Sequence, residues 1–87
     1  MQNTNDLKMR VRQMLVENLM LQVKPEEITD DLSLFGEGLG LDSVDALQLV
    51  VALDKTFGLK IQDAEMAKGV LQNINTIVAA LEKHLNG

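Results

Sequence analysis

The sequence predicts an all-α fold: a four-helix bundle of three main helices and one short helix, with a long structured loop between the first two main helices. Three long segments carry apolar residues at helical spacing, and proline, glycine, asparagine or aspartate stands at their borders. No segment shows the strict alternation of apolar and polar residues that is typical of a half-buried strand. With 87 residues, of which 46% are hydrophobic, we expect one packed domain over residues 1–87.

The first helix is predicted over residues 5–21, "NDLKMRVRQMLVENLML". Its apolar residues recur near every third or fourth position and predict one buried stripe: Leu7, Val11, Met14, Leu15 and Leu21. Asn5 or Asp6 can cap its start. The helix is expected to end before Pro25, because the residue that precedes a proline disfavours helical backbone.

Residues 24–42 form the long connection, and a short helical turn is expected to follow Pro25. Leucines and one phenylalanine interleave with its polar residues, which indicates a loop that packs on the core. Residues 25–45 also hold seven acids and no base: Glu26, Glu27, Asp30, Asp31, Glu37, Asp42 and Asp45. These acids indicate either a solvated loop or a docking surface for basic partners. Nucleic acid is not an expected partner, since phosphate binding needs a basic patch.

The remaining helices follow in quick succession. The second main helix is predicted over residues 42–57, with Gly58 as a left-handed cap, and residues 59–61 form an extended connector. A short helix over residues 62–69 is expected to close at Gly69. The last helix covers residues 73–85, with Asn73 or Asn75 as its cap. One stripe of this helix is expected to face the core: Ile74, Ile77, Val78, Leu81 and Leu85.

The residue inventory argues against catalysis by this chain. It has no cysteine, which excludes thiolate metal sites and cysteine nucleophiles. Its one histidine, His84, lies near a helix end, where interaction with the helix dipole or with water is the ordinary role. The acids lack the spacing of a metal-binding loop, and "GEGLG" has neither the preceding strand nor the lysine of a phosphate-binding loop. We therefore expect no metal site and no enzyme.

Targeting signals are also missing from the sequence pattern. The first ten residues show no basic start followed by an apolar run, so they do not resemble a secretory signal. No apolar stretch approaches the roughly 18–20 residues of a membrane span. We expect a cytoplasmic protein without stable membrane insertion.

The start of the second main helix holds a candidate functional residue. With Asp42 at the N-cap, Ser43 is the first helical residue and Asp45 the third. Asp42 accepts from the free amides of the first turn and Asp45 adds a favourable charge, so helix initiation does not need Ser43. Its hydroxyl is expected to point outward, where the positive helix end favours an attached phosphate and the two neighbouring acids oppose it.

The same helix carries two apolar stripes. At about 100° per residue, the core stripe consists of Ala46, Leu49, Val50, Leu53 and Phe57. A second stripe of Val44, Leu47 and Val51 has its centre about 130° away. A small bundle buries only one of these faces, so the second stripe is expected to be exposed beside Ser43 and to contact a partner. The alternative is that Leu39 or Leu41 of the loop covers it.

The stretch "GLGLDSVDALQLVVALDKTFG", residues 38–58, resembles the attachment segment of acyl carrier proteins, and "VRQMLVENL", "LKIQDAEMAKG" and "NINTIVAAL" resemble the family's other helical segments. The resemblance implies that Ser43 receives 4′-phosphopantetheine from coenzyme A through a phosphopantetheinyl transferase, aided by Asp42. The arm's terminal thiol would then carry acyl or polyketide-type intermediates as thioesters. The resemblance also implies that the partner enzymes dock on the second helix through Val44, Asp45, Leu47, Gln48 and Val51.

The implied function is that of a monomeric, non-catalytic carrier for fatty-acid, lipid or polyketide biosynthesis, whose partners are the transferase and acyl-loading and condensing enzymes. Gln48, Lys55 and Thr56 stand where general fatty-acid carriers commonly have acids, and Leu41 replaces a small residue. These departures indicate a carrier for a specialised synthase set. Two alternatives remain open: an aminoacyl or peptidyl carrier, and a helical interaction domain that is never modified.

Overall fold

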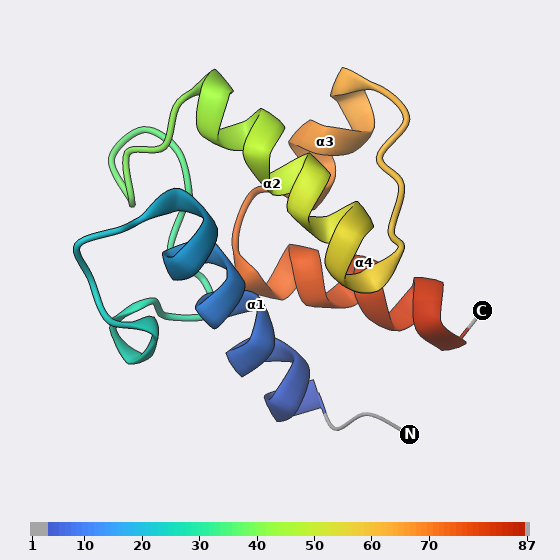
Figure 1. The fold of residues 1–87 in the computed structure, drawn as a ribbon, viewed down its shortest axis with the longest axis horizontal. Helices are drawn as coiled ribbons and strands as arrows, with labels where there is room; N and C mark the ends of the chain where they lie inside the picture. Colours follow the sequence, from blue (N-terminus) through green and yellow to red (C-terminus); the bar gives the residue numbers. More distant parts are fainter. Residues whose placement is uncertain (1–3, 87) are drawn as a thin grey trace.

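The structure of the protein, a computed structural model, describes residues 4–86 and consists of helices joined by loops (Figure 1). The order is α1 (Thr4–Leu19), the 3₁₀ turn η1 (Pro25–Glu27), α2 (Ser43–Phe57), α3 (Ala64–Val70) and α4 (Ile74–Asn86). Residues 4–86 contain no strand, only an isolated bridge between Phe35 and Leu41. The all-α, four-helix architecture with a long loop before α2 is therefore confirmed, as is the turn after Pro25.

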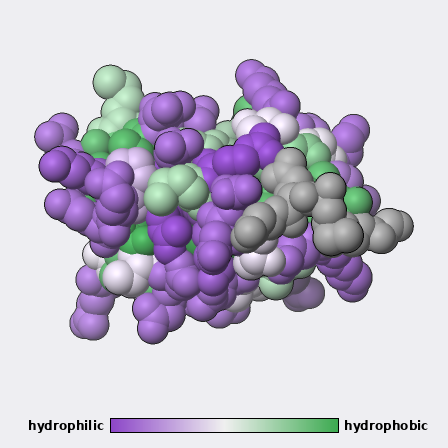
Figure 2. Space-filling model, turned by 90° about the horizontal axis from the view of Figure 1, so that it is seen from below, coloured by the Kyte–Doolittle hydropathy of each residue, from purple (hydrophilic) through white to green (hydrophobic). Residues whose placement is uncertain are grey.

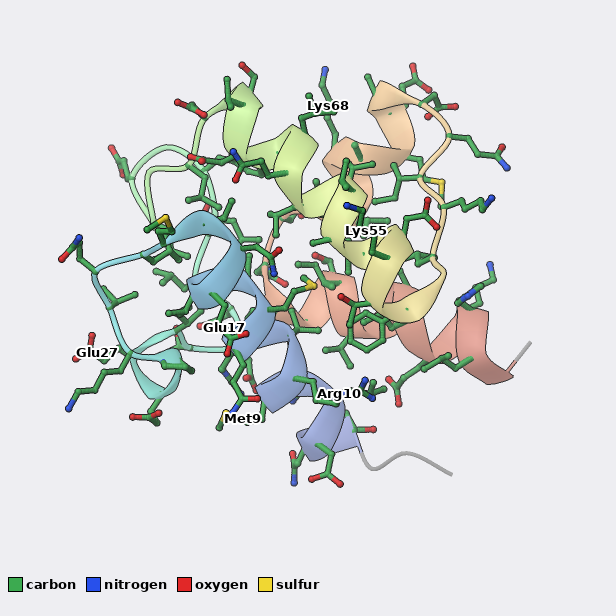
Figure 3. The ribbon with its side chains drawn as sticks, viewed as in Figure 1. Met9, Arg10, Glu17, Glu27, Lys55 and Lys68 are labelled. Atoms are coloured by element: carbon green, nitrogen blue, oxygen red, sulfur yellow. The ribbon has the colours of Figure 1, made fainter. Side chains whose placement is uncertain are left out.

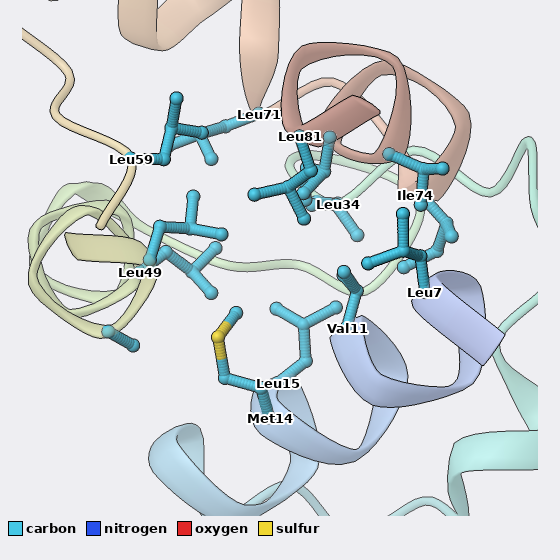
Figure 4. Packing of buried hydrophobic residues seen from close by; sticks show 14 of the residues in the cluster. Leu7, Val11, Met14, Leu15, Leu34, Leu49, Leu59, Leu71, Ile74 and Leu81 are labelled. Atoms are coloured by element: carbon cyan, nitrogen blue, oxygen red, sulfur yellow. The ribbon is translucent and has the colours of Figure 1, made fainter. Parts of the chain in front are cut away.

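The helices surround one apolar core. α1 contacts α2 and α4, and α3 contacts α4. Figure 4 shows side chains from α1, α2 and α4 meeting in the centre, with Leu34 of the long loop among them. Ile28 and Leu41 of that loop are buried as well, so the prediction that the loop packs on the core is confirmed. Burial of one such side chain contributes about 1.5–3 kcal/mol, which favours a fixed loop.

The two faces of α2 are as predicted. Leu49 and Leu53 are fully buried in the core, and the other members of the predicted core stripe are partly buried against it. Ala52, which the angular pattern did not assign to the core, is also buried. At about 100° per residue it lies about 60° beyond Leu49, outside the predicted edge of that stripe, so the buried face of α2 is wider than predicted.

The bounds of the helices differ from the sequence prediction most clearly in α1 and α3. α1 ends at Leu19, because Met20 adopts a left-handed conformation with φ 51°. The Leu21 amide then donates to the Val16 carbonyl at 3.1 Å, and Leu21 lies outside the helix, half-buried. α3 begins at Ala64 rather than at residue 62, because Asp63 caps it by accepting from the Met66 amide at 2.7 Å, and it ends at Val70 rather than at Gly69.

Caps and one stripe position also need correction. Asn5 and Asp6 lie within α1, which begins at Thr4, so neither is its cap. Asn73 caps α4 by accepting from the Thr76 amide at 2.9 Å, whereas Asn75 lies inside the helix. Leu85, predicted for the buried stripe, is 44% exposed because it lies in the last turn of α4, beyond the reach of the core.

Hydrophilic residues dominate the face seen in Figure 2, and the hydrophobic areas between them are small. Among the described residues, no helix is both long enough and apolar enough to cross a membrane.

Candidate functional site

The start of α2 is held by a reciprocal pair of hydrogen bonds. The Asp45 amide donates to Oδ1 of Asp42 at 3.0 Å, and the Asp42 amide donates to Oδ2 of Asp45 at 3.1 Å. Asp42 is extended at the N-cap and Ser43 is the first helical residue. This capping box satisfies the amides of Asp42 and Asp45 without using the Ser43 hydroxyl. The predicted roles of the two acids in helix initiation are confirmed.

The Ser43 side chain is left available. Ser43 is exposed, and its hydroxyl has no hydrogen-bond partner among residues 4–86. The chain has one other serine, Ser33, whose hydroxyl donates to the Phe35 carbonyl at 2.9 Å. Of the two serines, only Ser43 therefore presents an unengaged nucleophilic oxygen to a modifying enzyme.

Ser43 borders an open groove of about 550 Å³. Its walls come from the long loop, the start of α2, α3 and the turn before α4, so it exists only once these segments have packed together. Its lining is mainly apolar, from Leu41, Ala46 and Leu71 among others. Sequence reasoning found Ser43 but not this groove, since no local pattern reports the meeting of four segments.

The groove also offers polar groups. Ser33, Gln72 and Asn73 line it beside the apolar residues. Asn73 uses its side-chain oxygen to cap α4, while its amide nitrogen has no partner within the described part of the chain. A pantetheine arm alternates amide groups with short apolar links, so a groove with both kinds of lining fits it. Ser43 can hold the phosphate of such an arm, and Asn73 and Gln72 can bind its amides.

The second apolar stripe of α2 is exposed. Val44 is 61% exposed, Leu47 64% and Val51 43%. The loop does not cover it: Leu41 turns into the core and Leu39 packs partly against it. Beside the stripe lies a shallow hollow of about 310 Å³ between α1 and α2, lined by Leu47, Gln48 and Val51 among others. The predicted exposure is thus confirmed, and the loop-covered alternative is wrong.

Asp30 anchors the loop that forms one wall of the groove. Its carboxylate accepts from Lys8 Nζ at 2.9 Å and also pairs with Arg12, both on α1. Its backbone carbonyl accepts from the Asn75 amide of α4 at 3.0 Å, and Arg12 Nε donates to the Ile28 carbonyl at 2.6 Å. The hydrogen bond from Lys8, with the charge of Arg12, holds the pKa of the Asp30 carboxyl below its ordinary 3.8, although burial opposes the shift.

Asp30 was noted in the sequence only as one of the seven acids over residues 25–45, so its role could not be recognised there. His84 is exposed on the last helix. No cluster of three or more histidine or acidic side chains within residues 4–86 is arranged to hold a metal ion.

Comparison with known proteins agrees with this geometry. The family model described as "Phosphopantetheine attachment site" matches residues 10–81. The acyl carrier protein of Akkermansia muciniphila is 35% identical over 79 residues, which cover 91% of this chain and 92% of that relative. These matches span nearly all of the helical bundle, and they indicate a covalently attached 4′-phosphopantetheine prosthetic group. The chain belongs to the acyl carrier protein family.

Proposed function

We propose that this carrier holds acyl or polyketide-type intermediates on a 4′-phosphopantetheine arm attached to Ser43, and presents them to enzymes of fatty-acid, lipid or polyketide biosynthesis. The single observation that carries the proposal is the unengaged, exposed hydroxyl of Ser43 beside a groove that suits the arm. The arm supplies a terminal thiol that binds the cargo as a thioester. The chain itself supplies the attachment oxygen, the groove and an address for its partners, and it catalyses no reaction.

Attachment of the arm is a group transfer from coenzyme A. The Ser43 oxygen attacks the phosphorus that bears pantetheine, and a new phosphoester bond forms there. The pyrophosphate bond of coenzyme A breaks, adenosine bisphosphate leaves, and the hydroxyl proton passes to a base on the transferase. The capping box favours this step because it fixes Ser43 in the first turn of α2, while Asp42 lies next to it for contact with the transferase.

Partner enzymes dock, in this proposal, on the outward face of α2 through Val44, Asp45, Leu47, Gln48 and Val51. The exposure of the apolar members supports this assignment, since three large apolar side chains on one helix face mark an interaction surface. We also expect a monomer that forms one domain over residues 1–87 and works in the cytoplasm. The single core to which all the main helices contribute supports one domain.

The partner set is proposed to be a specialised one. Gln48, Lys55 and Thr56 are all exposed on α2, where acids would attract the basic surfaces of general fatty-acid enzymes. We expect the loaded carrier to turn over at least tenfold more slowly than a general fatty-acid carrier with those enzymes. Full-rate turnover would overturn the specialised assignment.

Intact-protein mass spectrometry tests the attachment site. The protein is incubated with coenzyme A and a broad-specificity phosphopantetheinyl transferase, and the mass is expected to rise by one phosphopantetheinyl group. Ser43→Ala should abolish the gain, whereas Ser33→Ala, at the chain's other serine and on the same groove, should retain it.

A gain in mass that survives Ser43→Ala would refute Ser43 as the site. No gain with several transferases would favour an unmodified interaction domain, and loading by aminoacyl-transferring enzymes alone would favour an aminoacyl carrier.

A further inference from the structure

The groove beside Ser43 has an uneven distribution of charge. Two carboxylates line it, from Asp31 of the loop and Asp42 at the cap of α2. Its lining includes a single cation among the described residues, Lys68 of α3. A phosphodiester on Ser43 would add a further negative charge to this acidic surrounding, and like charges at close range repel. One cation on the same groove is therefore in a position to offset that repulsion.

Lys68 is free to do so. It lies in the last turn of α3, is exposed, and forms no ion pair or hydrogen bond with any described residue. Lys8 and Arg12 differ in this respect, because both are engaged with Asp30. Figure 3 shows the Lys68 side chain rising from α3 at the end of the molecule where α2 begins. Lysine is a flexible point charge that binds phosphate well without a fixed geometry.

We propose that the Lys68 ammonium pairs with the phosphodiester of the arm on Ser43 and thereby directs the arm into the groove between α2 and α3. This proposal rests on the proposed attachment at Ser43. It assigns Lys68 a role toward the prosthetic group and makes α3 the element that orients the arm. From this position the arm would extend over the apolar lining formed by Ala67 and Leu71 rather than into open solvent.

Nuclear magnetic resonance of the unmodified and modified proteins tests the pairing without any partner enzyme. Attachment of the arm should shift the side-chain Nζ and Cε resonances of Lys68 while leaving those of Lys55 unchanged. Lys55 is a matched control, because it is also an exposed lysine in the last turn of a helix but does not line this groove. The ³¹P resonance of the arm should shift in Lys68→Met and not in Lys55→Met, and Lys68→Arg should restore the wild-type value.

Thermal unfolding provides a second measurement. The modified Lys68→Met protein should melt about 2–4 °C below the modified wild type at low salt, a difference that salt should reduce. The unmodified pair should melt within about 1 °C of each other. Equal losses in the modified and unmodified forms would show that Lys68 pairs with a carboxylate instead, and would overturn the proposal. Unchanged resonances in a protein that has gained the arm's mass would overturn the pairing alone, whereas no mass gain would overturn the attachment at Ser43 and the pairing with it.

Discussion

Gly38 is the loop glycine at which an added Cβ atom would lie closest to the backbone of another residue. A Cβ atom there would lie 1.7 Å from the Ser33 carbonyl oxygen, the same oxygen that accepts from the Leu39 amide at 2.9 Å. Gly38→Ala must therefore move the loop that forms one wall of the groove. We expect it to lower the free energy of unfolding by about 1–3 kcal/mol and to slow modification of Ser43. Urea unfolding followed by circular dichroism measures the first effect, since the chain has no tryptophan or tyrosine for fluorescence.

Gly69→Ala is the control for this substitution. A Cβ atom at Gly69 has nothing within 4 Å, and the residue is helical. Alanine there should leave the protein unchanged or stabilise it by up to about 1 kcal/mol, because glycine is a poor helix former. Wild-type stability of Gly38→Ala would show that the loop adapts to a side chain at no cost.

Residue-scale features were predictable where their cause is local. The capping role of Asp42 and Asp45 follows from a spacing of three residues, so the availability of Ser43 could be inferred from the sequence alone. The end of α1 could not be inferred, because Met20 occupies a left-handed position where glycine is usual. The end of α3 was predicted wrongly for the opposite reason, because Gly69 is a glycine that lies within its helix rather than after it.

At the scale of one element, α2 divides into a face that stabilises the fold and a face that we assign to partners. Leu47→Asp places a charge on the exposed face, so the free energy of unfolding should change by less than about 0.5 kcal/mol. The same variant should weaken docking of the transferase or a condensing enzyme by about tenfold or more, as loss of one buried leucine contact predicts. Surface plasmon resonance measures the affinity and urea unfolding the stability.

Leu49→Asp is the matched variant on the buried face of the same helix. Leu49 is completely buried, so an aspartate there should unfold the domain. Unfolding of Leu47→Asp as well would place Leu47 in the core, and unchanged affinity in a folded Leu47→Asp would remove it from the docking face. The division itself was predictable because both faces follow from the helical repeat of about 100° per residue.

At the scale of the whole molecule, the sequence was least informative about contacts between distant segments. Lys8 and Arg12 precede Asp30 by 22 and 18 residues, and helical periodicity carries no information at that separation. The groove beside Ser43 likewise needs the loop, α2 and α3 in one place. Asp30 joins three of these distant segments, since it attaches the loop to α1 by its carboxylate and to α4 by its backbone carbonyl.

The Asp30 contacts predict how stability depends on pH. The pKa of this carboxyl is lowered in the folded protein, so the folded state favours the ionised form. The resulting stabilisation is fully present well above pH 3.8, the ordinary value, and is lost as the pH falls through that value toward the lower folded pKa. Asp30→Asn, which mimics the protonated state, should cost roughly 1 kcal/mol at pH 7, the scale of partly exposed ion pairs. Its difference in unfolding free energy from wild type should shrink toward pH 3 in urea unfolding curves.

Asp31→Asn is the control, because Asp31 forms no ion pair with the described residues, and it should follow the wild-type curve throughout. A gap between Asp30→Asn and wild type that stays constant from pH 7 to pH 3 would show that the carboxylate charge does not hold the loop.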